Sequence, residues 1–204
     1  STVEEVLEII ERNNYLRGKV LQLPEEGSIF PDTYFFQRDD DKNTVILRMQ
    51  KKMDKEVNII WRSKNNLLKS KLDLIKLASL IESEAIQNNE KYIISSVFHN
   101  RIKKGMKLQS DPTVLYLKNL KSKIKSRKIF KKDLLSDNPW NTYTREGLPL
   151  TPICNPGKEA IDAAMNPRST NFIYFVANGV GGHRFSSNYK QHLKNIKLWK
   201  NKVR

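Results

Sequence analysis

The sequence predicts an α+β fold that is rich in helix, with a small β-hairpin or sheet near the C-terminus. Apolar residues recur at helical spacing along most of the chain, a short apolar and aromatic run at 172–177 is typical of a strand, and three glycines at 178–182 favour a hairpin turn. The 204 residues are enough for one or two domains with a buried core. We divide them into a mainly helical accessory region, 1–70, and a main domain, 71–204.

The accessory region is predicted to hold two helices. Thr2 and Glu5 have the spacing of a capping box, and an apolar stripe follows them. Residues 29–36 are aromatic but contain Pro31, which favours a packed loop. From Thr44 onward apolar residues again recur at helical spacing, which predicts a second helix of about five turns.

The main domain is predicted to contain further helices at 72–85 and 90–104, the latter stopped by Gly105. Asp111 before Pro112 has the form of an N-cap that starts a short helix, and Asn155 before Pro156 repeats the device. After the buried strand and hairpin turn, a last helix is predicted from residue 188. Its inward residues are expected to be Leu193, Ile196, Trp199 and Val203.

The chain is strongly basic, with 37 Lys and Arg against 22 Asp and Glu. Eight of the basic residues lie at 118–132, a run without an acid that could hold a polyanion. The run has Phe130 as its single aromatic residue and no recognition helix beside it. We therefore favour a solvated loop or a membrane-surface contact, and no nucleic-acid partner.

Histidine and cysteine give no sign of a metal site. His99, His183 and His192 lack the spacing of metal ligands, and Cys154 has no second cysteine to pair with. We expect no metal and no cofactor. His183, beside the glycine-rich turn, could face a cleft, although a structural or surface role is more common for such a residue.

Two carboxylates interrupt the apolar helix predicted at 72–85. At about 100° per residue, Glu82 and Glu84 point about 200° apart. Glu84 continues the apolar stripe that includes Leu77, so its carboxyl should be partly desolvated, which raises a carboxyl pKa and suits a general acid. Glu82 would support the site or pair with a base such as Arg101. The alternative is that both are ordinary surface glutamates.

Two polar segments, 109–113 and 140–144, suggest a binding cleft. Amides, hydroxyls and aromatic rings on loops of a rigid scaffold suit a carbohydrate, which offers hydroxyls and apolar C–H faces. The residues assigned to substrate binding are Gln109, Ser110, Asp111, Asn141, Thr142 and Tyr143.

Several separate blocks carry a family resemblance. They are 30–34 (Phe-Pro-Asp-Thr-Tyr), 77–85 (Leu-Ala-Ser-Leu-Ile-Glu-Ser-Glu-Ala), 96–101 (Ser-Val-Phe-His-Asn-Arg), 106–113 (Met-Lys-Leu-Gln-Ser-Asp-Pro-Thr), 141–144 (Asn-Thr-Tyr-Thr), 147–149 (Gly-Leu-Pro), 155–157 (Asn-Pro-Gly), 174–177 (Tyr-Phe-Val-Ala) and 181–183 (Gly-Gly-His). In their order and spacing these blocks resemble the YceG-like family, the MltG-type endolytic murein transglycosylases.

The resemblance implies a lyase that cuts inside peptidoglycan glycan strands, between N-acetylmuramic acid and N-acetylglucosamine, and leaves 1,6-anhydro ends. The family's catalytic residue is the second Glu of a Glu-x-Glu motif, which falls on Glu84 and makes 71–204 the catalytic domain. Members carry an upstream membrane helix and a LysM-like module, neither recognisable here. We therefore expect the periplasmic, extracytoplasmic part of a single-pass inner (cytoplasmic) membrane protein, with peptidoglycan synthases or divisome proteins as possible partners.

Two other functions stay open at this point. A non-catalytic basic module could bind polyanions through 118–132, and such binding would be sensitive to salt. A true glycoside hydrolase would need a second carboxylate facing Glu84, for which Asp111 is the candidate. An older association of the family with aminodeoxychorismate lyase finds no pyridoxal-phosphate lysine motif here.

Overall fold

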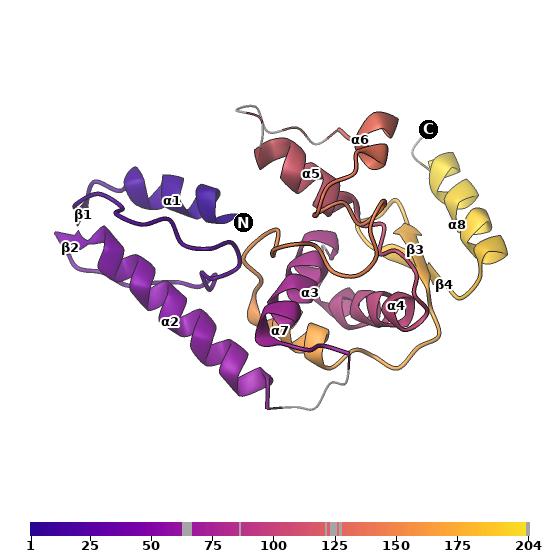
Figure 1. The fold of residues 1–204 in the computed structure, drawn as a ribbon, viewed down its shortest axis with the longest axis horizontal. Helices are drawn as coiled ribbons and strands as arrows, with labels where there is room; N and C mark the ends of the chain where they lie inside the picture. Colours follow the sequence, from indigo (N-terminus) through magenta and orange to yellow (C-terminus); the bar gives the residue numbers. More distant parts are fainter. Residues whose placement is uncertain (63–66, 86, 121, 123–125, 127, 203–204) are drawn as a thin grey trace.

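The computed structural model describes residues 1–62, 67–85, 87–120, 122, 126 and 128–202. Figure 1 shows the N-terminal part, with helices α1 and α2, at one end of the long axis, and the helix α8 at the other. Between them lie the remaining helices and a two-stranded antiparallel sheet. The predicted α+β class, rich in helix and with a small sheet near the C-terminus, is confirmed.

The N-terminal part is built on two helices. Helix α1 (Val3–Glu11) begins with the predicted capping box between Thr2 and Glu5, and helix α2 (Lys42–Ile60) is capped by Asp41. Their apolar faces share a small core with Ile29, which is fully buried. Two short strands, β1 (Leu16–Arg17) after α1 and β2 (Asp40–Asp41) before α2, pair in parallel. Strands of two residues leave no periodic signal, and the sequence did not predict them.

The main core surrounds helix α3 (Lys71–Glu84), whose apolar stripe is fully buried. Helices α4 (Lys91–Lys103) and α7 (Lys158–Met165) pack against it, and the short 3₁₀ helix η1 (Asn88–Glu90) precedes α4. The second half of α2 joins the same core, so α2 contributes to both apolar clusters. The division of the chain at residue 70 stays a prediction.

The basic run begins in one helix and ends in the next. Helix α5 (Asp111–Leu120) continues past Leu117, where the sequence predicts its end, and helix α6 (Lys131–Leu135) contains the other end of the run. Lys118 bonds inward to Asp133 at 3.0 Å, so this lysine is not a free surface charge. Part of the predicted loop, at 121, 123–125 and 127, lies outside the described residues.

The C-terminal part contains the predicted hairpin. Strand β3 (Tyr174–Ala177) pairs antiparallel with β4 (His183–Ser186), and helix α8 (Tyr189–Lys202) follows. The prediction of a buried strand was wrong, because all four residues of β3 are half-buried. Leu193 is exposed rather than inward, whereas Ile196 and Trp199 are partly covered. Val203 lies outside the described residues. Among the described helices, none has the length and apolar character needed to cross a membrane.

Asn155 is not the helix cap that the sequence predicts. Helix α7 begins after Gly157, and the Asn155 side chain instead accepts a hydrogen bond from the Ile29 N–H at 3.0 Å and donates to the Ser1 carbonyl at 3.2 Å. Its backbone N–H donates to the same carbonyl at 2.9 Å. The residue therefore fastens the N-terminal part to the loop before α7.

Replacing Asn155 by Ala is expected to lower the free energy of unfolding by about 2 kcal/mol, because the buried Ile29 N–H loses its acceptor. For a chain of this size the melting temperature should fall by about 4–8 °C. Thermal unfolding followed by circular dichroism measures this, with the exposed Asn201→Ala as the control. Equal melting temperatures for the two variants would contradict the role assigned to Asn155.

Candidate active site

Helix α3 ends at Glu84 and delivers its side chain to a cleft. The residues one turn earlier, Leu80 and Ile81, are fully buried in the core, so the same face of the helix carries the Glu84 carboxyl inward. Ala85 is in an extended conformation, so no further helical turn follows Glu84. The predicted direction of Glu84 is confirmed.

Ser110 holds one oxygen of this carboxyl. Its hydroxyl donates to Glu84 Oε1 at 2.7 Å, whereas Oε2 has no hydrogen-bond partner among the described residues. Because Oε1 already accepts a hydrogen bond, the proton of the neutral carboxyl resides on Oε2. That oxygen can then donate to a bound molecule.

Burial raises the pKa of Glu84 to about 7. The Ser110 hydrogen bond opposes this rise, the nearby Asp111 carboxylate adds to it, and the Arg101 guanidinium opposes it. Glu84 is therefore protonated in a large fraction of molecules near neutral pH. A carboxyl of this kind suits general acid catalysis.

A strained turn positions Ser110. Gln109, just before it, has a φ of +49°, a left-handed conformation that is uncommon outside glycine. Thr142 holds the turn, because its carbonyl accepts the Gln109 N–H at 3.0 Å and its Oγ1 accepts the Ser110 N–H at 2.9 Å. The two polar segments of the sequence therefore meet, as predicted.

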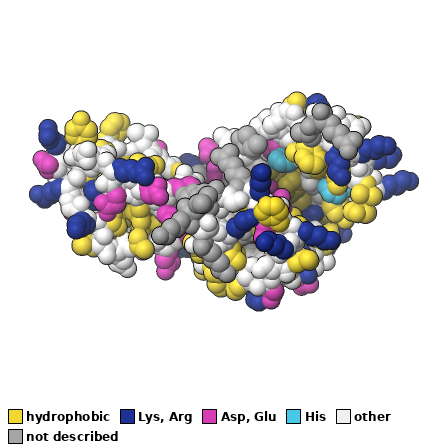
Figure 2. All heavy atoms as spheres, turned by 90° about the horizontal axis from the view of Figure 1, so that it is seen from above, with side chains coloured by type: hydrophobic (Ala, Val, Ile, Leu, Met, Phe, Trp, Pro, Cys, Tyr) yellow, Lys and Arg dark blue, Asp and Glu magenta, His cyan; other side chains and the backbone are white. Residues whose placement is uncertain are grey.

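Glu84 lines a cleft of about 320 Å³. The predicted residues Gln109, Asp111 and Tyr143 line it too, and the Tyr143 hydroxyl donates to Asp111. Burial, and then this bond, raise the pKa of Tyr143. Figure 2 shows a hollow in the larger lobe, with histidine, Lys and Arg side chains around it.

Three predicted site residues do not line this cleft. Asn141 and Thr142 are 1% and 2% exposed, and Asn141 Nδ2 donates to backbone carbonyls at the end of α6 and just after it, including that of Ser136 at 2.8 Å. Their side chains shape the loops and do not face a ligand. Ser110 is also buried and reaches the site only through its bond to Glu84.

Glu82 points to the other side of α3. Its Oε2 forms an ion pair with the buried Lys91 at 2.9 Å and accepts the Gly157 N–H at 3.3 Å. The proposed partner Arg101 is engaged elsewhere. Its Nε donates to the Ile173 carbonyl at 2.7 Å, and its Nη1 donates to the Leu108 carbonyl at 2.8 Å.

Several residues of the cleft were missed or given other roles. Arg101 lies in its wall and ties the residue before β3 to the turn before α5, and burial lowers its pKa. His183, Phe175 and Trp199 come from the hairpin and α8. The glycine-rich turn marked His183 as a possible cleft residue. Phe175 lay in a block of the family resemblance, and Trp199 was predicted to face inward without a role in the site.

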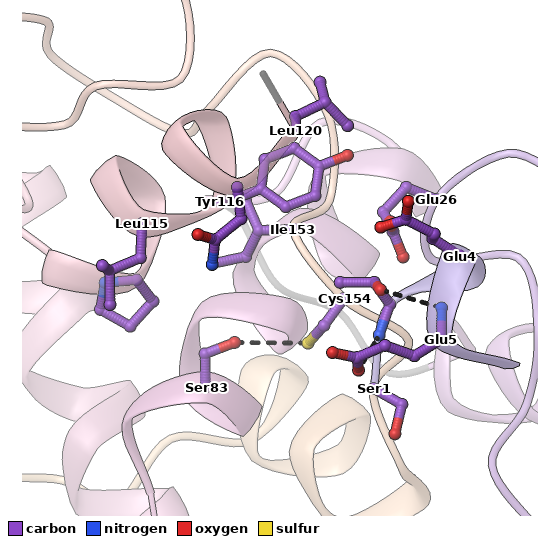
Figure 3. Close-up of a pocket in the computed structure, with 13 residues that line it drawn as sticks. Ser1, Glu4, Glu5, Glu26, Ser83, Leu115, Tyr116, Leu120, Ile153 and Cys154 are labelled. Carbon is purple, nitrogen blue, oxygen red and sulfur yellow. Dashed lines mark hydrogen bonds between the residues drawn. The ribbon is translucent and has the colours of Figure 1, made fainter. Parts of the chain in front are cut away.

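A second hollow, of about 290 Å³, lies where α1 meets α5 (Figure 3). Apolar side chains such as Leu115 and Ile153 line it together with Glu4, Glu5 and Glu26. Glu84 is not part of its wall, so the two hollows are separate sites on the chain.

Comparison with known proteins identifies the family. A sequence model of the YceG-like family matches residues 1–198, and the chain belongs to this family. The endolytic murein transglycosylase of Bacillus subtilis (strain 168) is 40% identical over 185 residues, and that of Streptococcus pneumoniae (strain ATCC BAA-255 / R6) is 30% identical over 176 residues.

These alignments cover 89% and 84% of this chain, but only 49% and 31% of the two relatives. The chain therefore spans about half, or less, of the relatives it matches. A crystal structure of a YceG-like protein from Listeria monocytogenes superimposes with a TM-score of 0.75 at 34% identity, covering 94% of this chain and 62% of that protein.

Proposed function

We propose that this chain is the catalytic part of an endolytic murein transglycosylase, with Glu84 as its single general acid and base. The observation that carries the proposal is a carboxyl with a pKa of about 7 in a polar cleft, one oxygen bonded to Ser110 and the other open. The names of the B. subtilis and S. pneumoniae relatives support the substrate, peptidoglycan.

The reaction begins with protonated Glu84 donating to the oxygen of the bond between N-acetylmuramic acid and N-acetylglucosamine. As the C1–O bond breaks, the C6 hydroxyl of the muramic acid attacks its own C1, and the Glu84 carboxylate takes the hydroxyl proton. The new C1–O6 bond closes a 1,6-anhydro ring, no water is consumed, and Glu84 ends in its starting state. Dipoles of Gln109 and Tyr143 would stabilise the positive charge that develops at C1.

Mass spectrometry of uncrosslinked glycan strands tests this reaction. Incubation with the protein should produce new ends lighter by one water than reducing ends. Reducing ends would instead identify a hydrolase and implicate Asp111, which lines the same cleft. Absence of any cleavage by full-length, membrane-anchored protein would reject the enzyme.

The rate should depend on the protonation of Glu84. The acid form is the active one, so kcat/KM is expected to be level below a pH of about 7 and to fall up to tenfold per pH unit above it. Initial rates on soluble strands between pH 5 and 9 measure the profile. A rate that rises through pH 7 would contradict the acid role.

We further infer the setting of the whole protein from the family resemblance. Its membrane anchor would hold this part on the extracytoplasmic side of the inner membrane, where peptidoglycan lies, and peptidoglycan synthases or divisome proteins would be its neighbours. Anchoring also raises the effective substrate concentration. Assays on this part alone should therefore use soluble strands at high concentration.

A further inference from the structure

The turn between β3 and β4 is built around a carboxylate. Asn178 Oδ1 accepts the Val180 N–H at 2.8 Å and the Gly182 N–H at 3.1 Å, which closes the turn. At Gly182 a Cβ atom would lie 2.7 Å from Glu90 Oε1 and 2.9 Å from Asn178 Nδ2. With any other residue there, the Glu90 carboxylate would have to move away from its present position beside the backbone.

Glu90, from the 3₁₀ helix before α4, uses both of its oxygens on His183. Oε1 accepts the His183 backbone N–H at 2.8 Å, and Oε2 accepts the ring Nδ1–H at 2.8 Å. The two side chains are 13% and 11% exposed. The Phe175 ring meets the imidazole edge-on, with 5.3 Å between centroids. The imidazole therefore has a fixed orientation, with a proton on Nδ1.

This clamp leaves Nε2 as the free nitrogen of the ring. No described residue bonds to Nε2, and His183 lines the same cleft as Glu84. A neutral imidazole with its proton on Nδ1 has a hydrogen-bond acceptor at Nε2. A polar atom with little solvent exposure is stabilised when a ligand supplies the missing partner.

We propose that His183 is a substrate-contacting residue, whose Nε2 accepts a hydrogen bond from a sugar hydroxyl of the bound glycan while Glu90 holds the ring in place. This inference rests on the proposed function for the identity of the ligand. It assigns a part in substrate binding to the hairpin, which lines the same cleft as Glu84. Glu90 is then a positioning residue, because it acts through His183.

Three substitutions separate contact with substrate from a purely structural tie. In His183→Asn the new amide would stand where Nδ1 stands and could still bond to Glu90, whereas in His183→Gln the longer side chain would bring its amide to the place of Nε2. His183→Ala removes both groups. We expect His183→Ala and His183→Asn to lower kcat/KM by about tenfold, and His183→Gln to recover most of the loss.

The measurement is kcat and KM on soluble strands, with melting temperatures as the control for folding. Wild-type activity in His183→Asn with loss in His183→Gln would overturn the proposal in favour of a structural tie. Unchanged activity in all three variants would also overturn it. Equal and severe loss of kcat in both amide variants, with KM unchanged, would overturn it in favour of proton transfer by the imidazole.

A binding titration keeps this inference separate from the proposed function. Strand affinity is compared between a chain carrying Glu84→Gln and one carrying Glu84→Gln with His183→Ala. About tenfold weaker binding in the second supports the contact even if the wild-type protein produces no anhydro ends, a result that would reject the catalytic proposal alone. Equal affinity of the two chains would overturn the contact.

Discussion

Glu84→Gln is expected to abolish glycan cleavage and to leave the fold intact. The amide has the shape of the carboxyl and can keep the bond from Ser110, but it has no acidic proton to donate and cannot accept one from the C6 hydroxyl. Loss of a general acid lowers a rate by about 10²–10⁴-fold, and here one group serves two steps. We expect a fall in kcat of at least about 10³-fold, measured by the yield of anhydro ends.

The matched control is Glu146→Gln, which changes the charge equally at an exposed glutamate outside the cleft. It should cleave strands at the wild-type rate. Wild-type turnover by Glu84→Gln would show that another residue is the acid.

Glu84→Gln is also expected to change how the stability of the folded chain depends on pH. Glu84 has a pKa raised from 4.5 to about 7 in the folded chain, so the native state binds the extra proton between these values. The contribution of Glu84 to the free energy of unfolding is fully present below about pH 4.5, where the carboxyl is protonated in both states. It is lost as the pH rises through about 7, because the buried carboxyl then becomes charged. Glu84→Gln should therefore melt like wild type at pH 4 and at a higher temperature than wild type at pH 8.

The second large effect is expected at Glu82 and is on stability. Glu82→Gln leaves the buried Lys91 ammonium without its carboxylate and weakens the link to the start of α7. Removing one partner of a buried ion pair costs about 3–5 kcal/mol, and we expect about 2–3 kcal/mol because the Glu82 side chain is 29% exposed. The melting temperature should fall by about 4–12 °C.

A second substitution tests the cause of this loss. Combining Glu82→Gln with Lys91→Met removes both charges and should recover most of the stability. At a temperature where every variant is folded, kcat should stay within about twofold of wild type. A large loss of kcat in folded Glu82→Gln would restore the role first predicted for Glu82, that of supporting the catalytic residue.

The helical period is the part of the site that could be predicted. An apolar stripe on a helix identifies which side chain is carried into the core, and this direction was correct for Glu84. The same geometry separates Glu82 from Glu84, and the structure has them bonded to different partners. The relative directions of two side chains on one helix follow from the helical period alone, so they can be predicted without knowing how the rest of the chain folds.

Polar loop residues could not be sorted in this way. Asn141 and Thr142 have the composition of a binding loop, but their side chains bond to neighbouring groups of the protein itself. Composition does not distinguish the two uses. His183 and Trp199 reach the cleft because β3 packs against α4 and α8 packs on the hairpin, which no local pattern encodes. The hydrogen bond from Asn155 to Ser1 likewise depends on tertiary packing and could not be predicted from a local pattern.

The hydrogen bond between Asn155 and Ser1 affects the order in which native contacts can form during synthesis. Asn155 Nδ2 and the Ser1 carbonyl are 154 positions apart, and the bond from Ile29 to the same side chain spans 126. Contacts so distant in sequence close late, because the loop between them must first be ordered. During synthesis, Ser1 and Ile29 emerge early, but they gain Asn155 as a partner only after residue 155 has left the ribosome. The N-terminal part can therefore form its own core between α1 and α2 before it is fastened to the loop that precedes α7.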